Sequence, residues 1–204
     1  MIKNIVFDMG NVLLQFTPRL FIQRLGFFGE DEELLMNQVF RSLEWARMDR
    51  GSLTESQAAE SICSRLPERF HPAVHSLTDQ WDRPIVPVDG MYELIEELKQ
   101  AGYSIYLLSN ASFRQHDYWP LIPCSRFFDG TLISADVGLV KPQPEIYGRL
   151  FNDFCLKPEE CFFVDDSPAN IEGAFCCGMP GAVFNNDVPA LRRAMAMEGI
   201  WVRQ

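Results

Sequence analysis

The sequence lacks any long run of hydrophobic residues: no apolar stretch approaches the roughly 18 consecutive residues that a membrane-spanning helix needs. Basic residues are also scarce, because 18 lysines and arginines stand against 28 aspartates and glutamates, for a formal net charge of -10. A chain this acidic repels the phosphate backbone of nucleic acids and the anionic surface of membranes. We therefore expect neither nucleic acid nor a membrane as a partner.

The sequence also has few histidines and no cysteines at the spacing of a metal site. The three histidines are scattered, and the six cysteines form no C-x-x-C pair and do not lie near a histidine at zinc-ligand spacing. The usual thiolate metal sites are therefore not predicted. Cys176 and Cys177 are adjacent, but both fall in an apolar helical pattern, so we expect them to be reduced and buried. With a first strand that begins at once and no secretory leader before it, these features predict a cytoplasmic protein.

The pattern that remains is that of a globular α/β protein. Hydrophobic residues make up 47% of the 204 residues and charged residues 23%, which is ordinary for a compact domain. Short apolar runs end at residue 8 and recur at 103–110, 131–134, 161–166 and 181–184, and helical patterns separate most of them. Strands that alternate with helices predict a parallel, Rossmann-like sheet with helices on both faces.

Residues 15–85 interrupt this alternation with a purely helical block. Helical spacing is found at 17–26, 30–49 and 54–66, and a fourth helix begins at His71 and Pro72. The block is too long for an ordinary connection. We predict that it is a small helical cap domain, inserted after the first strand of a core domain that comprises residues 1–14 and 86–204.

Polar side chains follow three of the predicted strands, and a lysine precedes a predicted helix. The carboxyl ends of parallel strands meet at one edge of a sheet, so we expect these residues to converge on one crevice: Asp8, Ser109, Asn110, Lys141, Asp165 and Asp166. Taken alone, each has a structural alternative, such as a helix cap for a serine or a turn for an aspartate. Three carboxylates in one crevice repel one another unless a cation joins them, which favours a divalent ion with oxygen ligands.

Four segments carry a resemblance to a known family. F-D-M-G-N-V, L-L-S-N, K-P followed by E-I-Y, and V-D-D-S-P-A-N-I-E-G-A have the order and spacing of the four motifs of haloacid dehalogenase-like (HAD) hydrolases. The match spans nearly the whole predicted core, and the helical insertion resembles the family's small helical cap. The D-x-G-N-V form, the Trp119-Pro120 pair and R-G-S-L-T at 50–54 resemble the branch that includes bacterial α-D-glucose-1-phosphate phosphatases.

The resemblance implies a phosphatase in which Asp8 attacks phosphorus to form an aspartyl-phosphate that water then hydrolyses. It implies that three residues bind the phosphoryl group, with the lysine also holding Asp8 in place: Ser109, Asn110 and Lys141. The implied cofactor is Mg²⁺, with Asp8, the backbone carbonyl of Gly10, Asp165 and Asp166 as its ligands. Asn170 falls where the fourth motif has a supporting polar residue.

Gly10 departs from the family pattern, because most phosphatases of the family have an aspartate there that protonates the leaving oxygen and then activates water. General acid–base help of this kind is worth about 10²- to 10⁴-fold. Four interpretations stay open. The substrate has a good leaving group, as in a sugar 1-phosphate or an acyl phosphate; the cap supplies the acid, with Glu44, Asp49 and Asp82 as candidates by location; the reaction is carbon–halogen hydrolysis; or the chain is a non-catalytic phospholigand-binding or interaction protein. A turn that needs a positive φ would also explain a glycine.

On these grounds we predict a Mg²⁺-dependent phosphatase of small phosphorylated metabolites that prefers a sugar phosphate. A binding protein and a 2-haloacid dehalogenase are the alternatives, in that order. Four cap residues are candidates for contact with a sugar ring and its hydroxyls, although core packing and solvation explain them better: Trp45, Arg47, Trp81 and Arg83.

Overall fold

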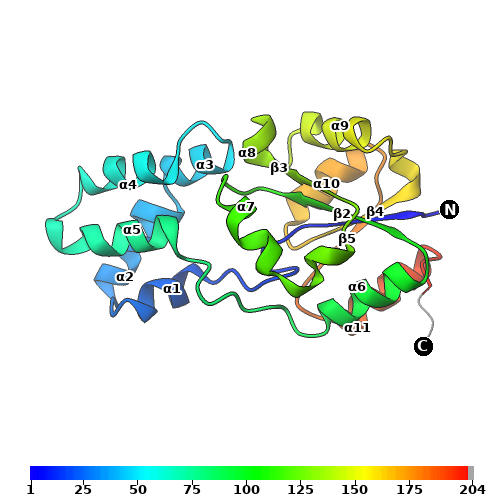
Figure 1. Ribbon diagram of the computed structural model, residues 1–204, viewed down its shortest axis with the longest axis horizontal. Coiled ribbons are helices and arrows are strands. Elements are labelled where there is room, and N and C mark those ends of the chain that lie inside the picture. The colour runs from blue at the N-terminus through cyan, green and yellow to red at the C-terminus, as the bar shows by residue number, and fades with distance from the viewer. Residues whose placement is uncertain (202–204) are drawn as a thin grey trace.

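The computed structural model describes residues 1–201 and contains a five-stranded parallel sheet (Figure 1). Its strands are β1 (Asn4–Phe7), β2 (Ser104–Ser109), β3 (Gly130–Ile133), β4 (Cys161–Asp165) and β5 (Gly181–Val183). They lie in the order β3-β2-β1-β4-β5, and every neighbouring pair is parallel. The predicted α/β fold class is confirmed, and β1 occupies the centre of the sheet.

Alternate side chains of β1 belong to two separate hydrophobic clusters. Ile5 and Phe7 join the cluster that contains apolar residues of α6 (Met91–Gln100) and α11 (Val188–Met197). Val6 joins the cluster formed with α9 (Pro144–Asp153) and α10 (Pro168–Cys176). Helices therefore cover both faces of the sheet, which explains why the strand is a continuous apolar run rather than an alternation of polar and apolar residues.

A group of five helices lies beside the sheet, at the left of Figure 1. These helices are α1 (Pro18–Arg24), α2 (Glu30–Leu35), α3 (Leu43–Asp49), α4 (Glu55–Cys63) and α5 (His71–Asp79). We call residues 18–79 the helical block. It has a hydrophobic cluster of its own, with Ile22, Val39, Ile62 and Val74 fully buried. The domain boundaries at residues 15 and 85 stay a prediction.

Two aromatic residues connect the helical block to the sheet. The rings of Phe16 and Trp81 meet edge to face, with centroids 4.9 Å apart and planes at 88°. Both pack against the large cluster of the sheet as well as against the cluster of the helical block. They stand near the two connections between the parts, so these contacts fix the block above the carboxyl end of β1.

One helix predicted from the sequence is interrupted. The periodicity predicts a continuous helix at 30–49, but α2 passes into a π-helical turn at Met36–Phe40, and the chain breaks before α3. The hydroxyl of Ser42 accepts a hydrogen bond from the backbone N–H of Trp45 and so begins a new helix. A serine that satisfies a backbone donor in this way favours a helix start over a helix interior. The new helix, α3, packs against α8 (Ser134–Val137) of the sheet.

Other local predictions have mixed outcomes. The capping box of Thr54 and Gln57 is confirmed. Ser167 precedes α10 as expected, but its side chain makes no capping hydrogen bond. Cys176 is exposed and Cys177 is only half-buried, contrary to the prediction that both are buried, because the pair lies at the end of α10; the six cysteines are all free, as predicted for Cys176 and Cys177. Within residues 1–201, no helix combines the length and the apolar character that a membrane span requires.

Candidate active site

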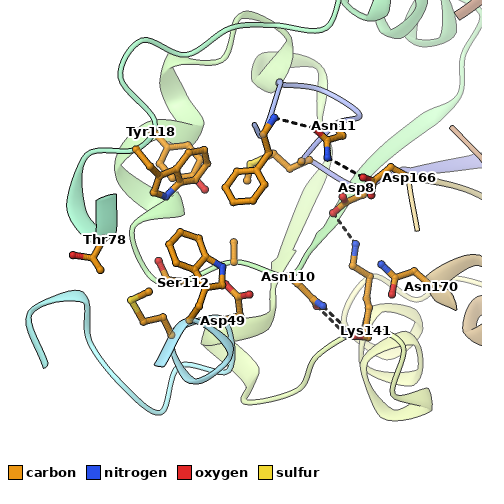
Figure 2. A pocket seen from close by; sticks show the side chains of 17 residues that line it. Asp8, Asn11, Asp49, Thr78, Asn110, Ser112, Tyr118, Lys141, Asp166 and Asn170 are labelled. Atoms are coloured by element: carbon orange, nitrogen blue, oxygen red, sulfur yellow. Dashed lines mark hydrogen bonds and ion pairs between the residues drawn. The ribbon is translucent and has the colours of Figure 1, made fainter. Parts of the chain in front are cut away.

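Three strand ends meet beneath the helical block. Asp8 directly follows β1, Ser109 ends β2 and Asp165 ends β4, and β1 pairs with both of the other strands. The chain leaves β1 toward β2 on one side and returns to β4 on the other, so this edge is the switch point at which α/β sheets bind ligands. Figure 2 shows the side chains that line the pocket at this point.

The ammonium group of Lys141 connects the ends of all three strands. Its Nζ atom lies 2.7 Å from Asp8 Oδ1, 2.6 Å from Asp165 Oδ2 and 2.9 Å from the backbone oxygen of Leu108. Each of its three protons therefore has an acceptor. Burial lowers the pKa of Lys141, but the charges of Asp8 and Asp165 raise it by more, so the amine stays protonated.

Asp8 is a buried carboxylate with only 8% of its surface exposed. Burial raises the pKa of its carboxyl; Lys141 opposes that rise and the nearby Asp165 adds to it. The single positive charge of Lys141 is shared between Asp8 and Asp165, so it does not fully offset the effect of burial on Asp8. An additional cation beside Asp8 would favour its ionised form, which is the form that can act as a nucleophile.

Three carboxylates form a cluster with the geometry of a cation site. Asp8, Asp165 and Asp166 each offer an oxygen, and these three atoms lie within 4.8 Å of one another. Carboxylate oxygens are the ligands that hard divalent ions such as Mg²⁺ prefer, so the donor set fits such an ion. The sequence prediction that these three residues converge agrees with this geometry, whereas their roles as ligands stay a prediction.

Asp165 is the most strongly anchored member of the cluster. Its Oδ1 accepts hydrogen bonds from the backbone N–H of Ser167 and from Asn170 Nδ2, and its Oδ2 accepts from Lys141 and again from Asn170. Asn170 therefore has the supporting position that the sequence suggested for it. Asp8 and Asp166 line the pocket, and Asp165 lies behind them.

Ser109 and Asn110, at the end of β2, differ in what they contact. Asn110 Oδ1 accepts a hydrogen bond from the backbone N–H of Lys141 at 2.8 Å, and its Nδ2 donates to the backbone oxygen of Lys141 at 3.0 Å. These are the contacts of a residue that positions the lysine. Ser109 is buried at the end of β2 and is not among the residues that line the pocket. Phosphate binding by either residue stays a prediction.

Gly10 lines the pocket, but the conformational explanation for it is wrong. Its φ is not positive; the left-handed residue of this turn is Asn11, with φ 55°. Asn11 Nδ2 donates a hydrogen bond to Asp166 Oδ2 at 2.9 Å, and its Oδ1 accepts one from the backbone N–H of Phe16. This role of Asn11 was not predicted, although the Gly-Asn pair is a turn signal and asparagine tolerates left-handed backbone.

The pocket has a charged floor and an aromatic wall. Its volume is about 230 Å³, with Asp8, Lys141 and Asp166 on one side and an apolar wall on the other, formed by Phe16, Trp45, Met48, Trp81 and Tyr118. Of the four candidate contacts in the helical block, the two tryptophans line the pocket. Arg47 and Arg83 are exposed and lie outside its lining. Met48 and Tyr118 were not predicted, because an apolar residue at helical spacing is indistinguishable from a core residue in a sequence.

The three acidic candidates of the cap differ in their partners and in whether they reach the pocket. Glu44 accepts hydrogen bonds from Arg65 and Ser61, and the Arg65 contacts hold the pKa of Glu44 down to about 2. Asp82 is buried and paired with Arg114 at 2.6 Å. Asp49 alone among the three lines the pocket, and burial raises the pKa of its carboxyl to about 7. Figure 2 shows Asp49 between Ser112 and Asn110 in this view.

Known proteins are similar to this chain in sequence and in fold. A family model for haloacid dehalogenase-like hydrolases matches residues 2–178. The sesquiterpene phosphatase of Aspergillus oryzae is 28% identical over 192 residues, 88% of each chain. D-ribitol-5-phosphate phosphatase of Bacteroides thetaiotaomicron is 26% identical over 192 residues, 84% of this chain and 86% of the relative. A crystal structure of a haloacid dehalogenase family enzyme from the same bacterium, in complex with magnesium and inorganic phosphate, matches with a TM-score of 0.64 at 23% identity over 90% of this chain and 94% of the other.

Proposed function

Because the chain belongs to the haloacid dehalogenase-like hydrolase family, we propose that it is a magnesium-dependent phosphatase that hydrolyses a small phosphorylated metabolite. The observation that carries this proposal is the arrangement around Asp8: a buried carboxylate at the floor of a pocket, paired with Lys141 and clustered with two further carboxylates. Phosphoryl transfer depends mainly on positioning and on neutralising charge, and this arrangement supplies both.

Asp8 is the proposed nucleophile. One of its oxygens attacks phosphorus while the bond from phosphorus to the leaving oxygen breaks, which leaves an aspartyl-phosphate and an alkoxide that takes up a proton. Water then attacks phosphorus, the bond to Asp8 breaks, and inorganic phosphate is released. Lys141 holds Asp8 Oδ1 at 2.7 Å, and so orients the carboxylate and offsets negative charge that develops on the phosphoryl group.

The proposed cation site follows the predicted ligand set. Asp8, Asp165, Asp166 and the backbone carbonyl of Gly10 would hold Mg²⁺, and the bound ion would supply the second positive charge that the phosphoryl oxygens need. The carboxylate oxygens within 4.8 Å of one another support this proposal. The complex of the Bacteroides enzyme with magnesium and phosphate supports it by analogy of fold.

The proposed substrate class is a sugar or polyol phosphate, with a sugar 1-phosphate as the preferred form. The pocket offers the aromatic faces of Trp45 and Trp81 together with polar side chains at Thr78, Ser112 and Asp49. Aromatic faces beside hydrogen-bonding groups suit a ring that carries hydroxyls. The relative named for D-ribitol 5-phosphate supports a polyol phosphate.

A second candidate substrate is an isoprenoid monophosphate. The apolar side chains of Phe16, Met48 and the two tryptophans in the pocket lining favour it, because they offer no hydrogen-bond partner to a polyol beyond the indole N–H. The relative named as a sesquiterpene phosphatase supports this alternative. Two alternatives remain, a phospholigand-binding protein without turnover and a haloacid dehalogenase. The experiment below distinguishes both from a phosphatase.

The test is phosphate release from a panel of substrates, with magnesium and with EDTA, for the wild type and Asp8→Asn. The panel comprises glucose 1-phosphate, glucose 6-phosphate, ribitol 5-phosphate, farnesyl monophosphate and 2-chloropropionate, the last scored by chloride release. We expect phosphate release that requires both magnesium and Asp8. Binding of phosphate without turnover of any phosphate ester would overturn the proposal in favour of a binding protein, and chloride release would overturn it in favour of a dehalogenase.

A further inference from the structure

The helical block places one carboxylate in the pocket that the steps above leave without a role. Asp49 is the last residue of α3, and its side chain lines the pocket together with Asp8 and Lys141 (Figure 2). Within residues 1–201, the structure records no hydrogen bond and no ion pair to this carboxylate. A carboxylate that is neither paired nor fully exposed is free to contact a ligand in the pocket.

The backbone of Asp49 is fixed to the sheet rather than only to the helical block. Ser134 Oγ donates a hydrogen bond to the backbone oxygen of Asp49, and it accepts one at 2.9 Å from the backbone N–H of Ala111, in the loop after β2. Ser134 itself is fully buried. The Ser134 side chain thereby connects the backbone of Asp49 to the loop that follows β2.

Gly51 shows how closely the segment after α3 approaches α8. A Cβ atom at this position would lie 2.2 Å from the backbone oxygen of Ala135, and the residue has φ 71°. No other residue fits such an approach. The segment that carries Asp49 therefore lies directly against α8, which gives the Asp49 carboxylate a defined position above the pocket.

The direction of phosphoryl transfer gives this position a chemical meaning. In an in-line displacement the leaving oxygen lies on the side of phosphorus opposite the nucleophile. Asp8 belongs to the floor of the pocket, so the leaving oxygen faces the wall formed by the helical block. Asp49 is the acidic residue on that wall, since Glu44 is turned to Arg65 and Asp82 to Arg114.

We propose that Asp49 is the general acid and base of the reaction, in the role that Gly10 cannot fill. The inference rests on the proposed phosphatase function. In the first step the bond from Asp8 to phosphorus forms, the bond to the leaving oxygen breaks, and the Asp49 carboxyl gives its proton to that oxygen to release an alcohol. In the second step the Asp49 carboxylate takes a proton from the attacking water, phosphate leaves Asp8, and Asp49 is again protonated.

The electrostatic surroundings agree with this assignment. Burial raises the pKa of Asp49 to about 7, the charge of Asp8 adds to the rise, and Lys141 opposes it. Asp166 and the hydroxyl of Tyr118 are the other ionisable groups in the pocket lining. An acid whose pKa lies near neutral pH both gives and takes a proton efficiently.

The experiment compares the first turnover of Asp49→Asn on two substrates, an alkyl monophosphate and p-nitrophenyl phosphate, by rapid mixing in magnesium. The alkoxide needs a proton to leave, whereas nitrophenolate does not. We expect the rate of alcohol release to fall by about 10²- to 10⁴-fold, and the rate of the first nitrophenolate release to stay within about tenfold of the wild type. The burst should be followed by slow turnover, because the aspartyl-phosphate accumulates when no base activates water.

Two results would overturn the inference: an equal loss in the first turnover of both substrates, which indicates binding or structure, or no loss with the alkyl phosphate. Glu68→Gln, an exposed carboxylate in the same helical block, is the control for a charge change. The burst distinguishes a failure of the Asp49 proposal from a failure of the proposed phosphatase function. A variant that forms phosphoenzyme from p-nitrophenyl phosphate still carries out the phosphoryl transfer to Asp8. If the wild type releases no phosphate from either substrate, the proposed function fails before Asp49 is tested.

Discussion

A Cβ atom at Gly10 would lie 3.7 Å from the Cβ atom of Phe16, an ordinary van der Waals distance, and no other contact within 4 Å would oppose it. Gly10 also has no positive φ. A Cβ atom is therefore sterically admissible at the position where the family pattern has an aspartate. The backbone at this position does not require a glycine.

This room permits a rescue experiment. In the Asp49→Asn background, Gly10→Asp should restore part of the lost activity on an alkyl monophosphate, because it brings a carboxyl group back beside the leaving oxygen. We expect kcat/KM to rise about tenfold or more, within the range of general acid catalysis. Gly10→Asn in the same background adds the same volume without a transferable proton. Equal activity of the two double variants would contradict the prediction.

Magnesium should stabilise the fold through the carboxylate cluster. An ion that binds the native state at 100 times its dissociation constant adds about 2.7 kcal/mol to the free energy of unfolding. We expect the melting temperature to rise with magnesium concentration in the wild type, and the rise to be much smaller in Asp166→Asn, whose carboxylate lines the pocket. Glu172→Gln removes an exposed charge on α10 and should respond like the wild type. An undiminished rise in Asp166→Asn would remove this residue from the site.

Asn110 should matter for catalysis through Lys141. Asn110→Ala removes both hydrogen bonds to the backbone of Lys141, and a misplaced lysine no longer holds Asp8 in line. We expect kcat to fall about tenfold to a hundredfold with a smaller change in KM. Asn152→Ala, an exposed asparagine on α9, is the control. A rise in KM with kcat unchanged would instead support the direct phosphate-binding role predicted from the sequence.

The ion pair of Glu44 and Arg65 should contribute to stability in a pH-dependent way. Hydrogen bonds from Arg65 lower the pKa of Glu44 from 4.5 to about 2. A lowered pKa in the folded state stabilises the protein above the unfolded pKa, and this stability is lost as the pH falls from about 4.5 towards 2. Since Arg65 is 37% exposed, we expect a contribution of only about 1 kcal/mol.

Urea unfolding of Glu44→Gln and the wild type between pH 6 and pH 2.5 measures this contribution. The two proteins should differ most at pH 6, with the wild type more stable, and the difference should shrink as the pH falls. Other carboxylates titrate in both proteins, so the difference between them isolates Glu44. A difference that does not change with pH would show that the hydrogen bonds alone, and not the charge, stabilise the pair.

The sheet and the cluster at its edge could be predicted from the sequence because their signals are local. A buried parallel strand is a continuous apolar run, and a charged residue at its end is conspicuous, as at Asp8 and Asp165. The helical block could be recognised by length and periodicity, but the break at Ser42 was missed because its hydroxyl competes for a backbone donor inside a pattern that otherwise favours a helix.

The pocket wall could not be predicted, for a physical reason. Trp45, Met48 and Trp81 satisfy the same helical spacing as core residues, and only the packing of the block against the sheet decides which of them face the cavity. The distinction between Glu44, Asp49 and Asp82 likewise depends on partners distant in sequence. Arg65 pairs with the first and Arg114 with the last, and no pattern in the sequence connects these residues.

The central claim is that Asp8 becomes phosphorylated during turnover. Acid quench of the Asp49→Asn enzyme with p-nitrophenyl phosphate and magnesium, followed by borohydride reduction, converts an aspartyl-phosphate into homoserine, which peptide mass spectrometry locates. We expect homoserine at position 8. It should be absent without substrate and absent when EDTA replaces magnesium. Nitrophenolate release without homoserine, or homoserine at another carboxylate, would contradict it.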